Sequence, residues 1–391
     1  MREVYAIGLG ITSFTRLEYP VAEIAAYAGM MALRDAGIRE VDHLYVANMG
    51  ACRLNHQSGL ASAVVDSLSL TPAGAETIEN GPASGASALK QGFMAVASGL
   101  HDVVMVIGAE RMREVNNLEA TDFVATLTHP LSEHIYGVTL PAMAGLFTRL
   151  YMEKYGVTER HLAMVAVKNH AHAMDNFFAH LHEPITLAGI LDSPEALTNN
   201  PYIADPLRFY DACPVSDGGA CIILASQEVA RKQGKPLVRL AGVGQATDTH
   251  AVHEREEPTD LLAVRRAAEQ AFRMAGVTPQ DVHVAELHDA FTILEIVESE
   301  EVGFFPKGQG HLALERGETR LGGRLPINPS GGLKAKGHPV GATGVGQAHE
   351  IVLQLRGEAG NRQVKDARVG FTCNFGGFGN NVVCLTFVRE D

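Results

Sequence analysis

Short apolar runs alternate with amphipathic stretches along this chain, a pattern typical of α/β proteins. The apolar run at 4–14 closes on Gly-x-Gly, and the segment 28–49 then reads as an amphipathic helix, a polar turn and an apolar strand. The same order returns at 238–248 and 267–288. Any α/β protein repeats helix and strand units, but two matching segments in one order favour an internal duplication.

The two copies share their helix ends. Gly37 and Gly276 follow the predicted helices, where a helix C-cap requires a positive φ angle. Asp42 and Asp281 occupy the polar turns before the next strands. We therefore predict that each half builds a largely parallel sheet covered by helices.

This pattern divides the chain into an N-terminal half at 1–235 and a C-terminal half at 236–391. The first half contains a predicted buried strand at 103–112, and then an irregular stretch at about 113–200 rich in His, Asn and Pro. Long insertions on a rigid scaffold often carry substrate contacts. We expect this insertion to shape a substrate pocket.

Composition narrows the class of protein. With 391 residues, 46% hydrophobic and 20% charged, the chain is expected to be globular, and its net charge of −13 argues against a nucleic-acid or anionic-membrane surface. Its five cysteines form no CxxC pair, so no metal site is predicted. No secretory signal and no apolar run of about 20 residues are present, and a cytoplasmic location is predicted.

Two loops in the second half carry candidate histidines. His288 and Asp289, in the segment 286–292, follow the repeated strand, and α/β sheets bind ligands at such strand ends. The alternative is that Asp289 only caps a helix. His338 lies in the glycine-rich segment 328–347, where the backbone can approach a ligand closely. A buried structural histidine is the alternative there.

Two further segments contain a candidate cysteine and a helix start. Cys373 ends a predicted strand within 371–381, and a lone cysteine in such a place more often packs than reacts. The segment 78–92 contains a tight turn that leads into a small-residue helix start. The first amides of a helix usually face a reactive or anionic group, yet the exposed position here is Pro82.

Taken together, these loops resemble the active-site loops of the thiolase superfamily, most closely its sterol-carrier-protein-type and archaeal branch. The likeness covers essentially the whole chain, and the segments 136–146, 168–176 and 213–221 share it. The resemblance implies a thiolase fold, in which duplicated βαβαβαββ halves form a five-layer α-β-α-β-α sandwich. It also implies a loop domain inserted in the N-terminal half and an intact pantetheine tunnel for coenzyme A.

The family has four active-site loops. In this sequence they correspond to Pro82-Ala83-Ser84-Gly85, His288-Asp289-Ala290-Phe291, Gly337-His338-Pro339 and Cys373-Asn374-Phe375-Gly376. The last loop matches Cys-x-Gly with one residue extra before the glycine. In the first loop, proline occupies the position at which the family keeps its acylated cysteine.

The resemblance implies roles for these residues. His338, together with a water held by His288, would grip the thioester oxygen and stabilise an enolate, and Cys373, with a lowered pKa, would act as a proton shuttle. Supporting roles fall to Asp289, Gly337, Pro339, Asn374, Gly376 and Ser84.

Proline at position 82 removes both contributions of the family's cysteine, the thiol and a backbone N–H. One such oxyanion donor is worth about 3–4 kcal/mol, and loss of the covalent route costs more. Ser84 is a poor substitute, because a serine hydroxyl needs an adjacent base.

Aldol chemistry needs an enolate site and a base but no acyl-enzyme. The favoured prediction is therefore a lyase that cleaves or forms the C–C bond of a 3-hydroxyacyl-CoA. Steroid side-chain aldolases of the superfamily also lack the cysteine, and Tyr136 and Tyr210 are candidates for their catalytic tyrosines. One alternative is an acetyl-CoA acetyltransferase or 3-ketoacyl-CoA thiolase that works without an acyl-cysteine, and another is a silent acyl-CoA-binding or scaffold subunit.

The resemblance also implies partners. Coenzyme A would enter as part of the substrate, with no covalently bound cofactor. The family implies a homodimer or larger assembly, and this branch often pairs with a small zinc-ribbon and OB-fold subunit. Neither nucleic acid nor membrane is expected.

Overall fold

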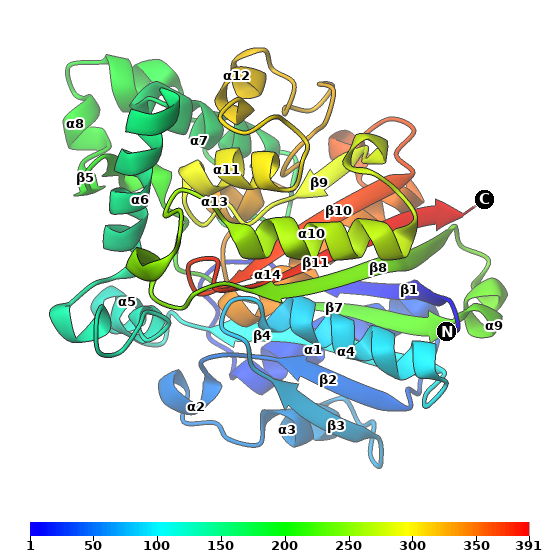
Figure 1. Cartoon of the computed structure of the whole chain (residues 1–391). Helices are drawn as coiled ribbons and strands as arrows, with labels where there is room; N and C mark the ends of the chain where they lie inside the picture. Colours follow the sequence, from blue (N-terminus) through cyan, green and yellow to red (C-terminus); the bar gives the residue numbers. More distant parts are fainter. Residues whose placement is uncertain (391) are drawn as a thin grey trace.

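The computed structural model describes residues 1–390 and builds both halves of the chain on one plan (Figure 1). The first half consists of β1 (Val4–Ile11), α1 (Val21–Ala36), β2 (His43–Ala47), α2 (Ala51–Leu54), α3 (Leu60–Ser67), β3 (Gly74–Ile78), α4 (Ser84–Ser98), β4 (Val103–Arg111) and β7 (Asp217–Ser226). The second half, after the short α9 (Gln227–Ala230), consists of β8 (Leu237–Thr247), α10 (Leu262–Ala275), β9 (Val284–Glu286), α11 (Thr292–Glu301), α12 (Gly310–Glu315), α13 (Gly332–Lys336), α14 (Val340–Arg356), β10 (Val369–Gly376) and β11 (Asn381–Glu390).

The strand orders of the two halves confirm the predicted duplication. The first half has the order β3-β2-β4-β7-β1, and the second continues with β8-β11-β10-β9. The place of β3 is taken in the second half by Ile327, which forms a parallel bridge with Ala285 of β9. The first strands of the two halves, β1 and β8, meet antiparallel at Tyr5 and Arg239.

The helix ends repeat as well. Gly37 and Gly276 cap α1 and α10 with φ angles of 65° and 70°, as predicted. The expectation of largely parallel sheets is wrong. The pairs β2–β3, β2–β4 and β9–β10 are parallel, but β7 and β11 run antiparallel to both neighbours. In the second half the reason is local, because a tight turn at 377–380 joins β10 directly to β11.

Five layers result, as the sequence predicts, although the nine strands form one continuous sheet through the β1–β8 contact. Helices α4 and α14 pack against each other between the two halves of this sheet, in an apolar core shared with strands of both halves. Helices α1 and α3 cover the outer face of the first half of the sheet. Helix α10 covers the outer face of the second half and lies across β8 and β11 (Figure 1).

The inserted segment lies to one side of this sandwich (Figure 1). It contains α5 (Asn117–Ala125), α6 (Leu140–Tyr155), α7 (Glu159–Ala173) and α8 (Ala196–Asn199), and the small pair of β5 (Tyr202–Ala204) and β6 (Leu207–Arg208) follows directly after it. Helix α7 packs against α11, α12 and α13 of the second half. Across residues 1–390, no helix combines the length and the hydrophobicity that crossing a bilayer requires.

The two central helices touch backbone to backbone near their N-terminal ends. A Cβ atom built on Gly85 of α4 would lie 2.8 Å from the amide nitrogen of Val345 and 3.0 Å from the carbonyl oxygen of Gly341, both on α14. A Cβ atom built on Gly344 of α14 would lie 2.4 Å from the amide nitrogen of Ala86 on α4 and 2.2 Å from Oδ1 of Asn374 on β10. Because only glycine permits this approach, the N-terminal ends of α4 and α14 lie side by side.

Replacing Gly85 by alanine should therefore lower the free energy of unfolding by about 1–3 kcal/mol, because the new methyl group meets backbone that cannot move aside. Gly346→Ala on α14 is the control, since its Cβ would meet only the edge of the Phe14 ring, at 3.1 Å. Urea denaturation followed by circular dichroism measures both. Equal destabilisation by the two variants would contradict the backbone contact.

Candidate functional site

A cavity of about 170 Å³ opens where the N-termini of α4 and α14 meet the loop after β9. Pro82, His288 and His338 all line it. The remaining wall is mainly apolar and includes Met112, Val124, Leu140, Phe291, Leu294 and Phe378. Val124 and Leu140 belong to α5 and α6, so the inserted segment forms part of the wall.

His288 is held from several sides. Its backbone N–H donates to Oε2 of Glu298 at 2.9 Å, and its ring stacks on Phe375 with centroids 5.1 Å apart. Its Nδ1 atom lies 3.1 Å from Nδ2 of Asn374 and 3.4 Å from the backbone nitrogen of Phe375. Both neighbours present N–H groups, so Nδ1 is turned away from the cavity and accepts from them.

His338 stands edge-on to His288, with ring centroids 5.0 Å apart and planes at 88°. Its Nδ1 atom lies 2.7 Å from Oγ1 of Thr343, and its backbone N–H donates to Oγ of Ser216 at 3.3 Å. Gly337 precedes it with a φ angle of 111°, a conformation that favours glycine. Pro339 follows it as the N-cap of α14.

Burial keeps both imidazoles neutral. It lowers the pKa of His338 to about 3, with a smaller contribution from the Lys336 ammonium. It also holds the pKa of His288 well below the ordinary value, and His338 acts in the same direction. A neutral imidazole has one N–H donor and one bare nitrogen. Each ring can therefore donate a hydrogen bond from its N–H, or accept a proton at its bare nitrogen.

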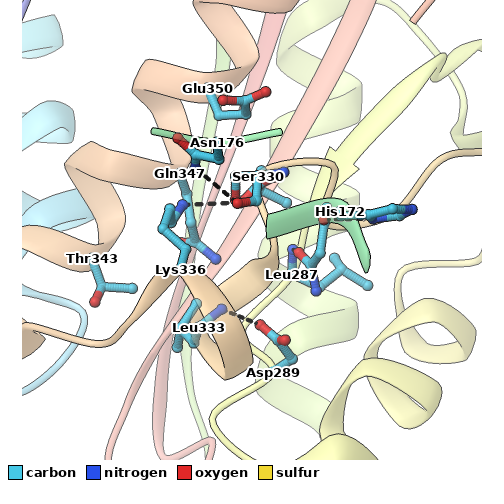
Figure 2. Close-up of polar contacts among 12 residues, drawn as sticks. His172, Asn176, Leu287, Asp289, Ser330, Leu333, Lys336, Thr343, Gln347 and Glu350 are labelled. Atoms are coloured by element: carbon cyan, nitrogen blue, oxygen red, sulfur yellow. Dashed lines mark hydrogen bonds and ion pairs between the residues drawn. The ribbon is translucent and has the colours of Figure 1, made fainter. Parts of the chain in front are cut away.

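Asp289 supports the site from behind. Its Oδ1 accepts from the backbone N–H of Leu333 at 2.6 Å, and its Oδ2 accepts from Nδ2 of Asn169 at 2.7 Å. Figure 2 shows the bond to Leu333, together with Lys336 on the same short helix. Burial, aided by Glu295, raises the pKa of Asp289 to about 7. Asp289 thus caps α13, which leads to His338, rather than the helix that follows it in sequence.

The predicted role of Cys373 does not fit its surroundings. Its thiol is fully buried and absent from the cavity wall, and burial raises its pKa well above the ordinary value, with Cys384 acting in the same direction. The expected low pKa is therefore wrong. Neighbouring residues of a strand face opposite sides, and it is Asn374 that reaches His288. In the family's Cys-x-Gly loop the cysteine lies two residues before the glycine, and in this chain Asn374 lies two residues before Gly376.

Position 82 contributes only an apolar proline ring to the cavity wall. Behind it, Ser84 accepts from the backbone N–H of Asn80 at 2.8 Å and donates to the carbonyl of Gly81 at 2.6 Å. Ala83 and Ser84 donate their own N–H groups to the carbonyls of Asn80 and Gly81. The hydroxyl and the first amides thus close the turn, and Ser84 is not arranged as a nucleophile.

The tyrosine candidates do not reach the cavity. Tyr136 is 79% exposed, and Tyr210 packs edge-on against His170, with centroids 5.6 Å apart. No tyrosine is among the side chains of residues 1–390 that line the cavity. Nor does this part of the chain gather three or more His, Cys, Asp or Glu side chains in a group suited to a metal ion.

Sequence reasoning missed three residues at the site. Thr343 and Glu298 contact the two histidines, and Cys213 lines the cavity. Thr343 lies five residues after His338 in the glycine-rich segment. A hydroxyl on the first turn of the helix that follows a histidine is a signal for a hydrogen-bonding partner of that histidine. Glu298 and Cys213 carry no local sequence signal, because tertiary packing alone brings them to His288 and the cavity.

Comparison with known families settles the relationship. The family described as "Thiolase, N-terminal domain" matches residues 6–228, and "Thiolase C-terminal domain-like" matches residues 244–389. This chain belongs to the thiolase superfamily. An acetyl-CoA acetyltransferase of Methanothermobacter thermautotrophicus is 41% identical to this superfamily member over the full length of both proteins.

A further relative places the chain in the sterol-carrier-protein-type branch of the thiolases. Sterol carrier protein 2 of Oryctolagus cuniculus is 34% identical across 98% of this chain and 71% of that protein. The solved structure named Ltp2-ChsH2(DUF35) aldolase superposes with a TM-score of 0.82 at 27% identity, covering 98% of this chain and 97% of its own.

Replacing Asn374 by alanine should slow acyl-CoA turnover about tenfold or more, because the buried Nδ1 of His288 loses its side-chain donor. Cys373→Ala on the same strand is the matched control, and we expect turnover within about threefold of the wild type because its thiol does not line the cavity. Steady-state kinetics on both variants checks this. A larger loss for Cys373→Ala would restore the thiol to the reaction.

Proposed function

We propose that this thiolase-superfamily protein is a C–C lyase that cleaves or forms 3-hydroxyacyl-CoA by aldol chemistry. The observation that carries the proposal is the composition of the cavity. Pro82 lies where the resemblance places the acyl-accepting cysteine, and two neutral histidines face the same space. Such a site retains the means to hold an enolate and move a proton, but has no thiol at that position.

The proposed reaction begins with removal of the 3-hydroxyl proton by one imidazole. The C2–C3 bond then breaks, C3 leaves as an aldehyde or ketone, and its bonding electrons pass to C2 and the thioester as an enolate. The N–H of the other imidazole holds the thioester oxygen, and such donors contribute about 3–4 kcal/mol in related sites. The first imidazole returns its proton to C2.

Cys213 does not restore a covalent route in this proposal. Its thiol lines the cavity, but burial raises its pKa to about 12, although the Lys334 ammonium acts in the opposite direction. The thiol form therefore prevails at neutral pH, and the thiolate is the nucleophile.

The wall of the cavity favours a small, uncharged acyl group on the coenzyme A substrate. No Asp, Glu, Lys or Arg side chain among the described residues lines it. Its volume of about 170 Å³ favours short groups. We propose short, apolar groups on both sides of the bond that breaks.

A second candidate is acyl transfer without an acyl-cysteine. It is favoured by the name of the relative that is 41% identical over its full length, an acetyl-CoA acetyltransferase. In that reaction the enolate or thiolate of one CoA derivative attacks a bound acyl-CoA directly. The two candidates differ in one requirement, because acyl transfer consumes or releases free coenzyme A.

We also propose that the protein acts as a homodimer or larger assembly in the cytoplasm, with a small zinc-ribbon and OB-fold partner. Strand β3 at the edge of the first sheet has mostly exposed side chains and is open to further pairing. The name of the aldolase structure joins Ltp2 to ChsH2(DUF35), which supports a search for a second subunit.

Product analysis tests the proposal directly. Incubated with short 3-hydroxyacyl-CoAs, the protein should release a carbonyl compound and a shorter acyl-CoA, at a rate independent of added coenzyme A. Mass spectrometry detects both products, and His338→Ala should reduce the rate about 10²–10⁴-fold. Cleavage of 3-ketoacyl-CoA that depends on free coenzyme A would instead establish the second candidate.

Burial of His338 predicts an unusual pH profile. Because its pKa is lowered to about 3, this imidazole stays unprotonated as the pH falls below the ordinary histidine value of about 6.5. Turnover at subsaturating substrate should therefore hold nearly constant from neutral pH to about pH 5, provided that samples returned to neutral pH recover full activity. A decline centred near pH 6.5 would contradict the burial of this group.

A further inference from the structure

We propose that His288 and His338 adopt opposite neutral tautomers, and that Thr343 is the positioning residue that leaves Nε2 of His338 free to accept a proton. The tautomers are a property of the resting protein, whereas the catalytic division of labour drawn from them rests on the proposed function. The proposal depends on what contacts the Nδ1 atom of each ring, on the side away from the cavity.

His288 has only donors at Nδ1. The backbone N–H of Phe375 can donate but not accept, and it lies 3.4 Å from Nδ1. The side-chain nitrogen of Asn374 lies at 3.1 Å, while the Oδ1 atom of the same amide accepts from the N–H of Ala86 at 3.4 Å. These bonds orient the amide and require a bare Nδ1, so the proton of neutral His288 is on Nε2.

His338 has a hydroxyl at Nδ1. Oγ1 of Thr343 lies 2.7 Å from Nδ1 and also 3.0 Å from the carbonyl oxygen of Pro339, to which the hydroxyl donates. A hydroxyl has one hydrogen, so Thr343 then accepts from Nδ1–H. The proton of neutral His338 is accordingly on Nδ1, and its Nε2 is bare.

Thr343 is well placed to hold this arrangement. It lies on the first turn of α14 (Figure 2), its side chain is 1% exposed, and His338 and Pro339 are its side-chain hydrogen-bonding partners among residues 1–390. The competing arrangement turns the hydroxyl toward Nδ1 and leaves the carbonyl of Pro339 to the N–H groups of Ala342 and Thr343, from which it also accepts. That arrangement would put the proton of His338 on Nε2 and remove the base.

Opposite tautomers give the two histidines different roles, one as a hydrogen-bond donor and the other as a proton acceptor. His288 offers a fixed Nε2–H donor for the thioester oxygen, and His338 offers a bare Nε2 for the 3-hydroxyl proton. When His338 takes up that proton, its Nδ1–H bond to Thr343 is unchanged. Proton uptake therefore needs no reorganisation behind the ring, which is the value of a preorganised partner.

Long-range ¹H–¹⁵N correlation spectra of protein labelled with ¹⁵N in histidine test the proposal without substrate. Spectra of His288→Gln and His338→Gln assign the two rings. We expect a bare Nδ1 and protonated Nε2 for His288, and the reverse for His338. Protonated Nε2 on His338, or the same tautomer on both rings, would overturn the proposal.

Variants of Thr343 add a kinetic arm. Thr343→Ser keeps the hydroxyl, and kcat should stay within about threefold of the wild type. Thr343→Val keeps the shape but removes the acceptor, and kcat should fall about 10²-fold or more with KM within about twofold, as a wrong tautomer slows a histidine base. An unchanged kcat in a folded Thr343→Val protein would overturn the role of Thr343.

The two arms separate this proposal from the proposed function. Failure to cleave any 3-hydroxyacyl-CoA would count against the aldol reaction but leave the spectra unaffected. Wrong tautomers in an active aldolase would count against the division of labour alone. If the protein turns over neither class of substrate, the spectra alone decide the tautomer of His338 and the role of Thr343. They are then compared between the wild type and Thr343→Val, in which the Nδ1–H of His338 should lose its acceptor.

Discussion

The structure depends on one close approach, the backbone contact between α4 and α14 at Gly85 and Gly344. Each helix is the central helix of its half, so the contact joins the duplicated halves along their common core. It occurs near the N-terminal end of both helices, and it therefore brings Pro82 and His338 to a single cavity. A side chain at this contact would separate the two ends, which explains why the site requires small residues beside its chemistry.

Burial then determines what the two histidines can do. Both rings lie in a low-dielectric setting that disfavours imidazolium, so they work as neutral donor and acceptor rather than as cations. Polar support comes from behind, through Glu298, Asn374 and Thr343, while the cavity side is apolar. A developing enolate would meet directed hydrogen bonds with little water to screen them.

Much of the fold was readable from the sequence, because local signals and the duplication agree. The glycine caps of α1 and α10 and the position of His288 at a strand end are examples. The errors arose where a contact joins distant segments. Asp289 caps α13 rather than the next helix, and the sequence could not show this because the helix it caps begins more than forty residues later. Residue type alone favours Cys373 over Asn374, whereas the strand turns Asn374 toward His288.

The central claim is that this cavity forms an acyl-CoA enolate without first acylating the protein. Incubation with acetyl-CoA in deuterated water, followed by mass spectrometry of both the thioester and the intact protein, tests it most directly. The account predicts deuterium at the α carbon of acetyl-CoA, loss of that exchange in His338→Ala, and protein of unchanged mass. An acetylated protein, with no deuterium in the remaining acetyl-CoA, would contradict it.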